Sequence, residues 1–175
     1  MKTLSGEMNL GWTMGKNKTL LIVSILFFCC TCCFAKQVSF QIVQHDNRCD
    51  KITEQSYVVE DKLLNDFFEY GYIVTNSDAS VSSSEDEDQN LLCTGIKEAI
   101  EGYSDYFIQV KLYYELIGGS QLVCLRRINW VITNVLTGST VTSKSFTVEK
   151  EYLTNDELIK LTSQLGADIN KSLKA

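Results

Sequence analysis

Hydrophobic and polar positions follow two different periods in the first half of the chain. Residues 38–44 alternate apolar and polar side chains, which is the two-residue period of a half-buried strand. Residues 56–70 repeat apolar side chains at helical spacing, and Gly71 follows as a residue that commonly ends a helix. The pattern then predicts a short second strand over residues 72–75 and a second helix over residues 91–100.

Three strands and a closing helix are predicted in the second half. The strand over residues 106–116 has apolar side chains at its even positions, so we expect one packed face and one wet face. Glycine-containing turns separate this strand from the next two. A capping-box sequence at residues 154–157 then starts an amphipathic helix that reaches residue 173. The other two predicted strands cover residues 121–136 and 140–149.

The predicted order β-α-β-α-β-β-β-α defines an α+β fold with a mixed sheet packed against helices on one face. We expect the first and last helices to cover that face. The fourth strand presents Ile128, Trp130 and Ile132 to the helices. Arg126 and Asn134 fall on the same side, and buried polar groups are costly alone, so we expect partners or a β-bulge there.

Residues 76–90, NSDASVSSSEDEDQN, interrupt these periods. The segment is polar, serine-rich and strongly acidic, so it has little apolar surface to bury. We therefore predict an acidic mobile loop at 76–90. Asp86 and Asp88 are potential cation ligands, but the segment lacks the glycine and terminal glutamate of a calcium loop, so no metal site is predicted.

The N-terminal residues predict export. An apolar run over residues 19–35 follows two lysines, and Cys33 and Ala35 are placed as at a signal-peptide cleavage site. We expect residues 1–35 to be a signal peptide, with Met14 as an alternative start. A membrane anchor and lipid attachment are the alternatives. Lipid attachment would use one of Cys29, Cys30, Cys32 or Cys33.

The remaining residues, 36–175, have the length of a single α/β domain. The whole chain carries 16 Lys and Arg against 22 Asp and Glu, a formal net charge of -6. This charge disfavours nucleic acid or an anionic membrane surface as the main partner. A single histidine, His45, argues against a His-dependent triad or a multi-His metal site.

Three cysteines, Cys49, Cys93 and Cys124, lie within the predicted domain. An odd number in an exported protein allows at most one disulfide plus a free thiol. No pair has the spacing of zinc ligands. Three interpretations stay open: unpaired cysteines, one disulfide of unassigned pairing, or a zinc site that includes His45.

The strand over residues 106–116 has more aromatic rings at its ends than one packed face can hold. Tyrosine together with arginine is the composition favoured at the energetic centre of protein interfaces. The alternative is that these rings cover the sheet edge or pack beneath the acidic segment. The candidate partner-binding face comprises Tyr103, Tyr106, Phe107, Tyr113 and Arg127.

No catalytic residues and no cofactor are predicted. A serine or cysteine nucleophile needs a base within hydrogen-bond reach. His45 is the one imidazole, and no activating glycine-rich turn surrounds Cys49 or Cys93. No pair of carboxylates stands out for glycosidase chemistry. We therefore expect a protein that is not an enzyme.

Three segments carry a family resemblance: DKLLNDFFEYGYIVTN at residues 61–76, INWVITNVLTGSTV at residues 128–141 and ELIKLTSQLGADINKSL at residues 157–173. With the element order, they resemble the periplasmic α/β domain shared by three envelope systems. These are the N-terminal domain of the Tol-system propeller protein, lipoprotein activators of penicillin-binding proteins, and the curli secretion channel. The resemblance implies a non-catalytic interaction domain.

We therefore expect an exported interaction or scaffold domain of the bacterial cell envelope, periplasmic or secreted, or alternatively a membrane-anchored lipoprotein. It would bind another envelope protein and no nucleic acid. A secreted carboxylate-dependent hydrolase and a small-ligand carrier are the alternatives. A hydrolase requires a concave pocket with convergent polar groups, and a carrier an internal apolar cavity. An interaction domain requires a flat or convex patch with a polar rim.

Overall fold

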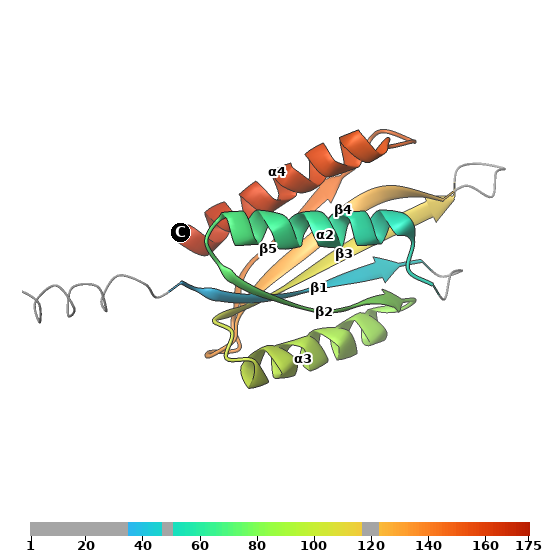
Figure 1. Cartoon of the computed structure of the whole chain (residues 1–175). Coiled ribbons are helices and arrows are strands. Elements are labelled where there is room, and N and C mark those ends of the chain that lie inside the picture. Colours follow the sequence, from blue (N-terminus) through green and yellow to red (C-terminus); the bar gives the residue numbers. More distant parts are fainter. Residues whose placement is uncertain (1–34, 47–50, 117–122) are drawn as a thin grey trace, which may run out of the picture. The chain divides into compact units, whose positions relative to one another are not determined.

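A mixed sheet with the strand order β2-β1-β3-β4-β5 organises the computed structural model of the chain (Figure 1). The structure describes residues 35–46, 51–116 and 123–175. The expected signal peptide with its cysteines, Cys49, and the turn at Gly118-Gly119 lie outside these residues. Residues 35–175 form one compact unit.

The observed elements follow the predicted order β-α-β-α-β-β-β-α, and the α+β class is confirmed. Strand β1 pairs in parallel with both β2 and β3, and β3, β4 and β5 form an antiparallel meander. The strands are β1 Gln37–His45, β2 Ile73–Ser82, β3 Tyr106–Leu116, β4 Val123–Asn134 and β5 Thr140–Thr147. The helices are α2 Glu54–Glu69, α3 Glu85–Glu101 and α4 Asn155–Lys174.

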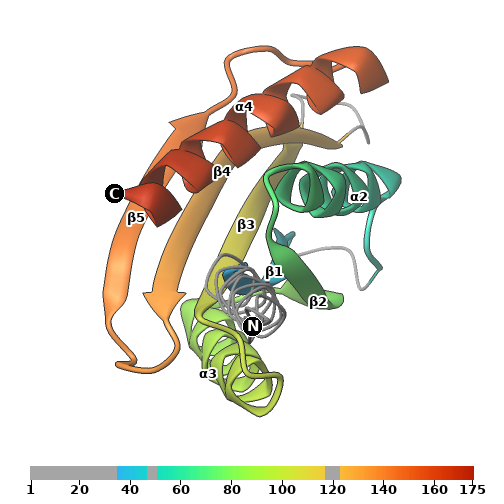
Figure 2. The same ribbon diagram turned by 60° about the vertical axis from the view of Figure 1, so that its left-hand side comes forward.

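The main hydrophobic core lies between one face of the sheet and helices α2 and α4, as expected (Figure 2). Even-numbered residues of β1 and β3 enter it because successive strand side chains point to opposite faces. Within it the Phe40 and Phe67 rings meet edge to face with centroids 5.7 Å apart. Its largest fully buried side chains are Phe40, Ile42, Leu63, Phe67, Ile108, Leu112, Ile128, Ile132, Leu158 and Ile169.

Helix α3 packs on the opposite face of the sheet, so helices cover both faces rather than one (Figure 2). A second, smaller core forms there around Phe107, Ala99 and Val135. The helix approaches closely because Gly95 has no side chain: a Cβ at this position would stand 2.2 Å from Cζ of Phe107. The sheet face that was expected to be solvated is therefore exposed only where α3 does not cover it.

The expected mobile loop at residues 76–90 is wrong, because the segment forms most of β2 and the start of α3. β2 is an edge strand, so its polar side chains reach water while its backbone pairs with β1. Ser84 caps α3 by accepting a hydrogen bond from the backbone N–H of Glu87. The four acidic residues that follow lie in the first helical turn, where the helix dipole favours negative charge.

Two local predictions are confirmed. A register shift between Tyr113 and Tyr114 leaves Arg126 as the extra residue of a β-bulge. The capping box of α4 pairs Thr154 with Glu157. A hydrogen bond from Lys150, followed by those from Thr154, lowers the pKa of Glu157 to about 2. In the part of the chain that the structure describes, no helix is both long and apolar enough to cross a membrane.

Candidate partner-binding site

Three side chains form a row across the α3 face of the sheet. His45 ends β1, Tyr113 is its partner on β3, and Arg127 is the partner of Tyr113 on β4. The His45 and Tyr113 ring centroids lie 4.8 Å apart, and Cζ of Arg127 lies 4.1 Å from the Tyr113 ring centroid. We call this arrangement the stacked row. Strand pairing fixes the spacing of its three members.

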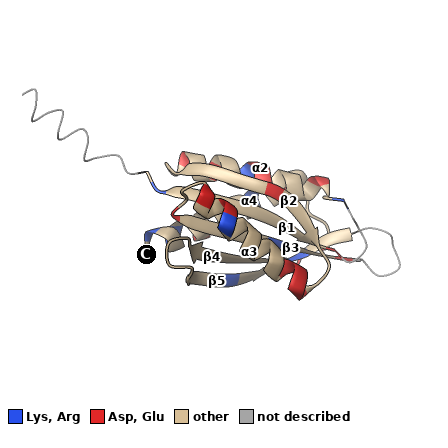
Figure 3. Cartoon of the chain, turned by 90° about the horizontal axis from the view of Figure 1, so that it is seen from below, with Lys and Arg blue, Asp and Glu red and all other residues tan. Residues whose placement is uncertain are grey.

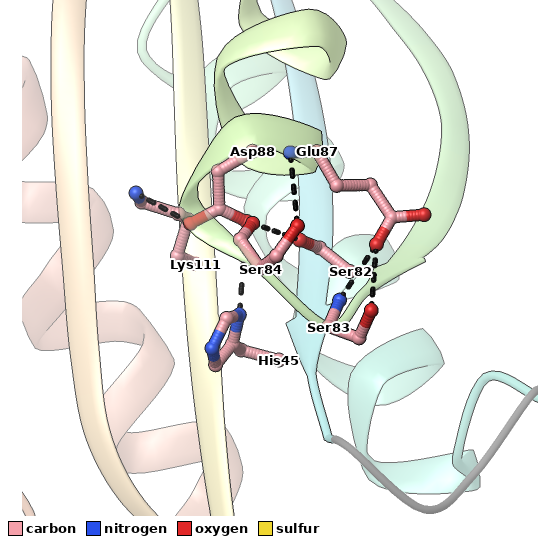
Figure 4. Close-up of polar contacts among 7 residues, drawn as sticks. All are labelled: His45, Ser82, Ser83, Ser84, Glu87, Asp88 and Lys111. Carbon is pink, nitrogen blue, oxygen red and sulfur yellow. Dashed lines mark hydrogen bonds and ion pairs between the residues drawn. The ribbon is translucent and has the colours of Figure 1, made fainter.

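A nearly buried carboxylate, Asp88, joins the stacked row to helix α3 (Figure 4). Its Oδ2 accepts a hydrogen bond from Nζ of Lys111 at 2.9 Å, and its Oδ1 lies 3.7 Å from Nδ1 of His45. Burial lowers the pKa of the Lys111 ammonium. The hydrogen bond and charge of Asp88, with a contribution from Tyr113, outweigh this effect and hold that pKa above its ordinary value. Lys111 therefore stays charged and neutralises Asp88.

The first turn of α3 holds Asp88 in place (Figure 4). Ser83 donates to the Glu87 carboxylate through both its backbone N–H, at 2.8 Å, and its hydroxyl, at 3.0 Å. The hydroxyl of Ser82 donates to the backbone carbonyl of Ser84. These contacts fix the chain immediately before Asp88, so the carboxylate is directed at the sheet. Serine and acidic residues that looked like a solvated loop thus support the site.

The structure separates the five residues of the predicted partner-binding face. Tyr113 and Arg127 lie in contact on the α3 side. Tyr106 points to the other face of β3, half-buried, with the Lys36 ammonium 5.2 Å from its ring centroid. Phe107 is fully buried beneath α3, so its place on a binding face is wrong. Tyr103 lies just after the end of α3 and is exposed.

Sequence reasoning missed His45, Asp88 and Lys111 as members of this site. In the sequence, His45 comes just after the predicted first strand and resembles a turn residue. Asp88 belongs to an acidic segment that resembles a solvated loop. The available signal was the wet face of β3: Lys111 and Tyr113 occupy neighbouring odd positions on it. Their partners became visible only with the parallel pairing of β1 with β3 and the position of α3.

Tyr103 combines an unusual backbone with an exposed ring. Its φ of 58° lies in the left-handed region, and its side chain is 89% exposed. Only glycine adopts this conformation without a steric cost. We expect Tyr103→Gly to raise the free energy of unfolding by about 1 kcal/mol, measured by urea denaturation. Tyr103→Phe is the control and should leave stability unchanged. Destabilisation by Tyr103→Gly would show that the ring supports the fold.

The stacked row is suited to binding rather than to chemistry. No carboxylate in the described ranges forms an ion pair with the exposed Arg127, although Glu115 lies further along the same face of β3. Stacking on Tyr113 orients the guanidinium and leaves its edge free to donate hydrogen bonds. The carboxylate of Asp88 is instead buried and already neutralised. An incoming acidic or polar group would therefore meet Arg127 first.

The described cysteines do not pair: Cys93 is exposed and Cys124 is buried, and both are free thiols. A disulfide between these two is excluded in this structure. In the described part of the chain, no three His, Cys, Asp or Glu side chains converge as metal ligands.

Residues 37–174 match a protein-family model described as "Uncharacterised protein", and the chain belongs to that family. No curated protein matches the chain. Similar solved structures include a PelC dodecamer from Paraburkholderia phytofirmans, with 12% identity, a TM-score of 0.43, and 81% of this chain and 89% of that chain covered.

Two further similar structures relate to the resemblance noted from the sequence. TolB from Acinetobacter baumannii has 9% identity and a TM-score of 0.38, covering 79% of this chain and 28% of that chain. Lipoprotein GNA1162 from Neisseria meningitidis has 12% identity and a TM-score of 0.41, covering 79% and 99%. At these values the similarities carry no argument about function.

Proposed function

We propose that the chain is an exported, non-catalytic interaction domain of the bacterial cell envelope that binds another envelope protein. The observation that carries this proposal is the contact between Tyr113 and Arg127 beside α3, where the uncovered part of this sheet face begins. The export part rests on the leader-like residues 19–35.

The uncovered face lies beside α3. That helix packs on β1, β2 and β3. Among the described residues, the α3 side of β5 and of β4 before the buried Thr133 stays open (Figure 3). We call it the open face; its described side chains are Arg127, Asn129, Val131, Ser143, Ser145 and Thr147. It is mostly polar, and the half-buried Tyr113 with Arg127 forms its aromatic and cationic end. Ordered aromatic and arginine side chains are the usual centres of binding energy in interfaces.

The same geometry supports a role without a chemical step. His45 faces a carboxylate that Lys111 already neutralises, and that carboxylate is almost wholly shielded from water. A hydrolase of the carboxylate type needs acidic groups that reach a substrate. We assign none of these residues to catalysis.

Site-specific cross-linking tests the proposal directly. A photoreactive amino acid placed at Val131, on the open face, should give one covalent adduct with an envelope protein in living cells. The same group at Phe68, which is 75% exposed on α2, is the control and should not. Adding Arg127→Glu should reduce the Val131 adduct at least tenfold, which is the effect of losing about 1.4 kcal/mol of binding energy.

Three results would contradict the proposal: equal adducts from Val131 and Phe68, an adduct that Arg127→Glu leaves unchanged, or an adduct found only in the cytoplasmic fraction. The last result would refute export, whereas the first two would refute the open face as the binding surface. Circular dichroism of the Arg127→Glu chain checks that its fold is unchanged.

A further inference from the structure

In the described part of the chain, strand β5 is an edge of the sheet with one side of its backbone unpaired. The backbone N–H of Val148 donates to the carbonyl of Arg126 at 2.8 Å, so the backbone N–H and C=O groups of residue 148 point toward β4. In an antiparallel ladder this direction alternates along the strand. Phe146 and Lys144 therefore also point their backbone groups inward, and the N–H and C=O groups of Ser143 and Ser145 point outward.

The two edges of the sheet differ in how they are protected. At β2, Asn76 donates to Glu60 of α2 at 2.8 Å and Ser77 donates to Glu98 of α3 at 2.7 Å, so helices hold this edge from both sides. At β5, α4 is the one described helix that lies alongside, on one face, and nearly every residue of the strand is exposed. An exposed, unprotected edge is a template for another strand.

A groove between β5 and α4 adjoins this edge. It holds about 60 Å³ of open space, and Trp130, Phe146 and Leu165 are among its lining residues. Phe146 is 43% exposed. Lys144, the one charged residue of β5, does not block the edge, because its ammonium lies over the Trp130 ring, 5.2 Å from the centroid. A strand added to β5 would bring its own side chains to this groove.

We propose that the occupant is a second copy of this chain, whose β5 pairs antiparallel with β5 about a two-fold axis through Ser145. In this register Phe146 of each copy lies opposite Lys144 of the other, beside the groove. Ser145 faces Ser145, and Ser143 faces Thr147, so no like charges are directly opposed. A register centred on Lys144 would instead oppose two lysines, which is destabilising.

The pairing satisfies the outward backbone groups of both strands and covers both exposed Phe146 rings. Each of these contacts occurs twice because the interface is symmetric. The product is a closed dimer with one continuous ten-stranded sheet, twice the five strands of one copy. In this dimer, β2 of each copy forms one of the two outer edges of the ten-stranded sheet.

Disulfide trapping tests the register. Opposed residues that exchange backbone hydrogen bonds have Cα atoms about 5.5 Å apart, within the range that a disulfide spans. In the full chain with Cys29, Cys30, Cys32, Cys33, Cys49 and Cys93 replaced by serine, Ser145→Cys should form a covalent dimer that reducing agent dissolves. Ser143→Cys is the matched control: the two copies of residue 143 would lie four residues out of register, about 13 Å apart, and should not cross-link.

Sedimentation equilibrium of the unmodified chain tests the dimer itself. Ser145→Pro removes an outward N–H and no backbone bond to β4; on that side it loses only the exposed hydrogen bond from the Ser145 hydroxyl to Asn129, at 2.7 Å. It should therefore raise the dimer dissociation constant at least tenfold without changing the far-ultraviolet spectrum. A chain that stays monomeric at high concentration overturns the proposal and leaves the edge to a different protein. Equal cross-linking at residues 143 and 145 also overturns it. If Ser145→Pro does not fold, the two cysteine variants decide alone.

Discussion

Replacing Asp88 with alanine is expected to lower the free energy of unfolding by about 3 kcal/mol. The Asp88 side chain is 6% exposed, and its carboxylate lies 2.9 Å from the Lys111 ammonium, whose side chain is itself 25% exposed. Removing it leaves a largely enclosed positive charge without a partner. Breaking a fully buried pair costs about 3–5 kcal/mol, and the remaining exposure of Lys111 places this case at the lower end. Urea denaturation measures the change.

Two comparisons separate this effect from the loss of a surface contact. Lys150 pairs with Glu157 at 2.5 Å, but both side chains are well exposed, so Lys150→Ala should change stability little. Asp88→Leu combined with Lys111→Met removes both charges and should recover most of the lost stability. If Asp88→Ala were no more harmful than Lys150→Ala, the charge pair would not anchor α3.

Gly95→Val is expected to lower the free energy of unfolding by about 3 kcal/mol. The first added carbon would stand 2.2 Å from Cζ of Phe107, far inside contact distance. Phe107 is fully buried, so its ring has no room to move aside. The helix-propensity gain from replacing glycine, below about 1 kcal/mol, is smaller than the cost of overpacking.

Thr94→Val places the same side chain on the exposed side of α3, one residue away, and should change stability by less than about 0.5 kcal/mol. Phe107→Leu makes room for the new side chain, so Gly95→Val with Phe107→Leu should cost less than the sum of the two single changes. Similar losses from Gly95→Val and Thr94→Val would indicate a general effect on the helix instead of this contact.

Periodicity predicted the elements wherever a segment buries one regular face. β3 and α4 are examples: the even positions of β3 enter the main core, and α4 begins at the predicted capping box. The bulge at Arg126 followed from the cost of turning an arginine toward the helices. The prediction for residues 76–90 was wrong because β2 is a polar edge strand. Its stability comes from backbone pairing with β1 and not from a hydrophobic pattern.

The candidate site was predictable only in part, for a related reason. Tyr113 and Arg127 carry a composition typical of interfaces, and antiparallel neighbours in the chain bring them together. The contacts of His45 and Asp88 depend on which strands pair in parallel and on which face α3 packs. Residue spacing determines neither the parallel pairing nor the face on which α3 packs, because each brings together segments that are far apart in the chain.

The position of β1 determines when the chain can fold as it is made. This strand comes first in the described chain yet lies between β2 and β3, and the N–H of Gln37 bonds Asp105, 68 residues later. Until β3 has been synthesised, the apolar side chains of Val38, Phe40 and Ile42 have only half of their sheet partners. Contacts of such long range slow folding. β1 therefore cannot complete its pairing until β3 has been made, and until then its apolar side chains are a site of aggregation that chaperones must protect.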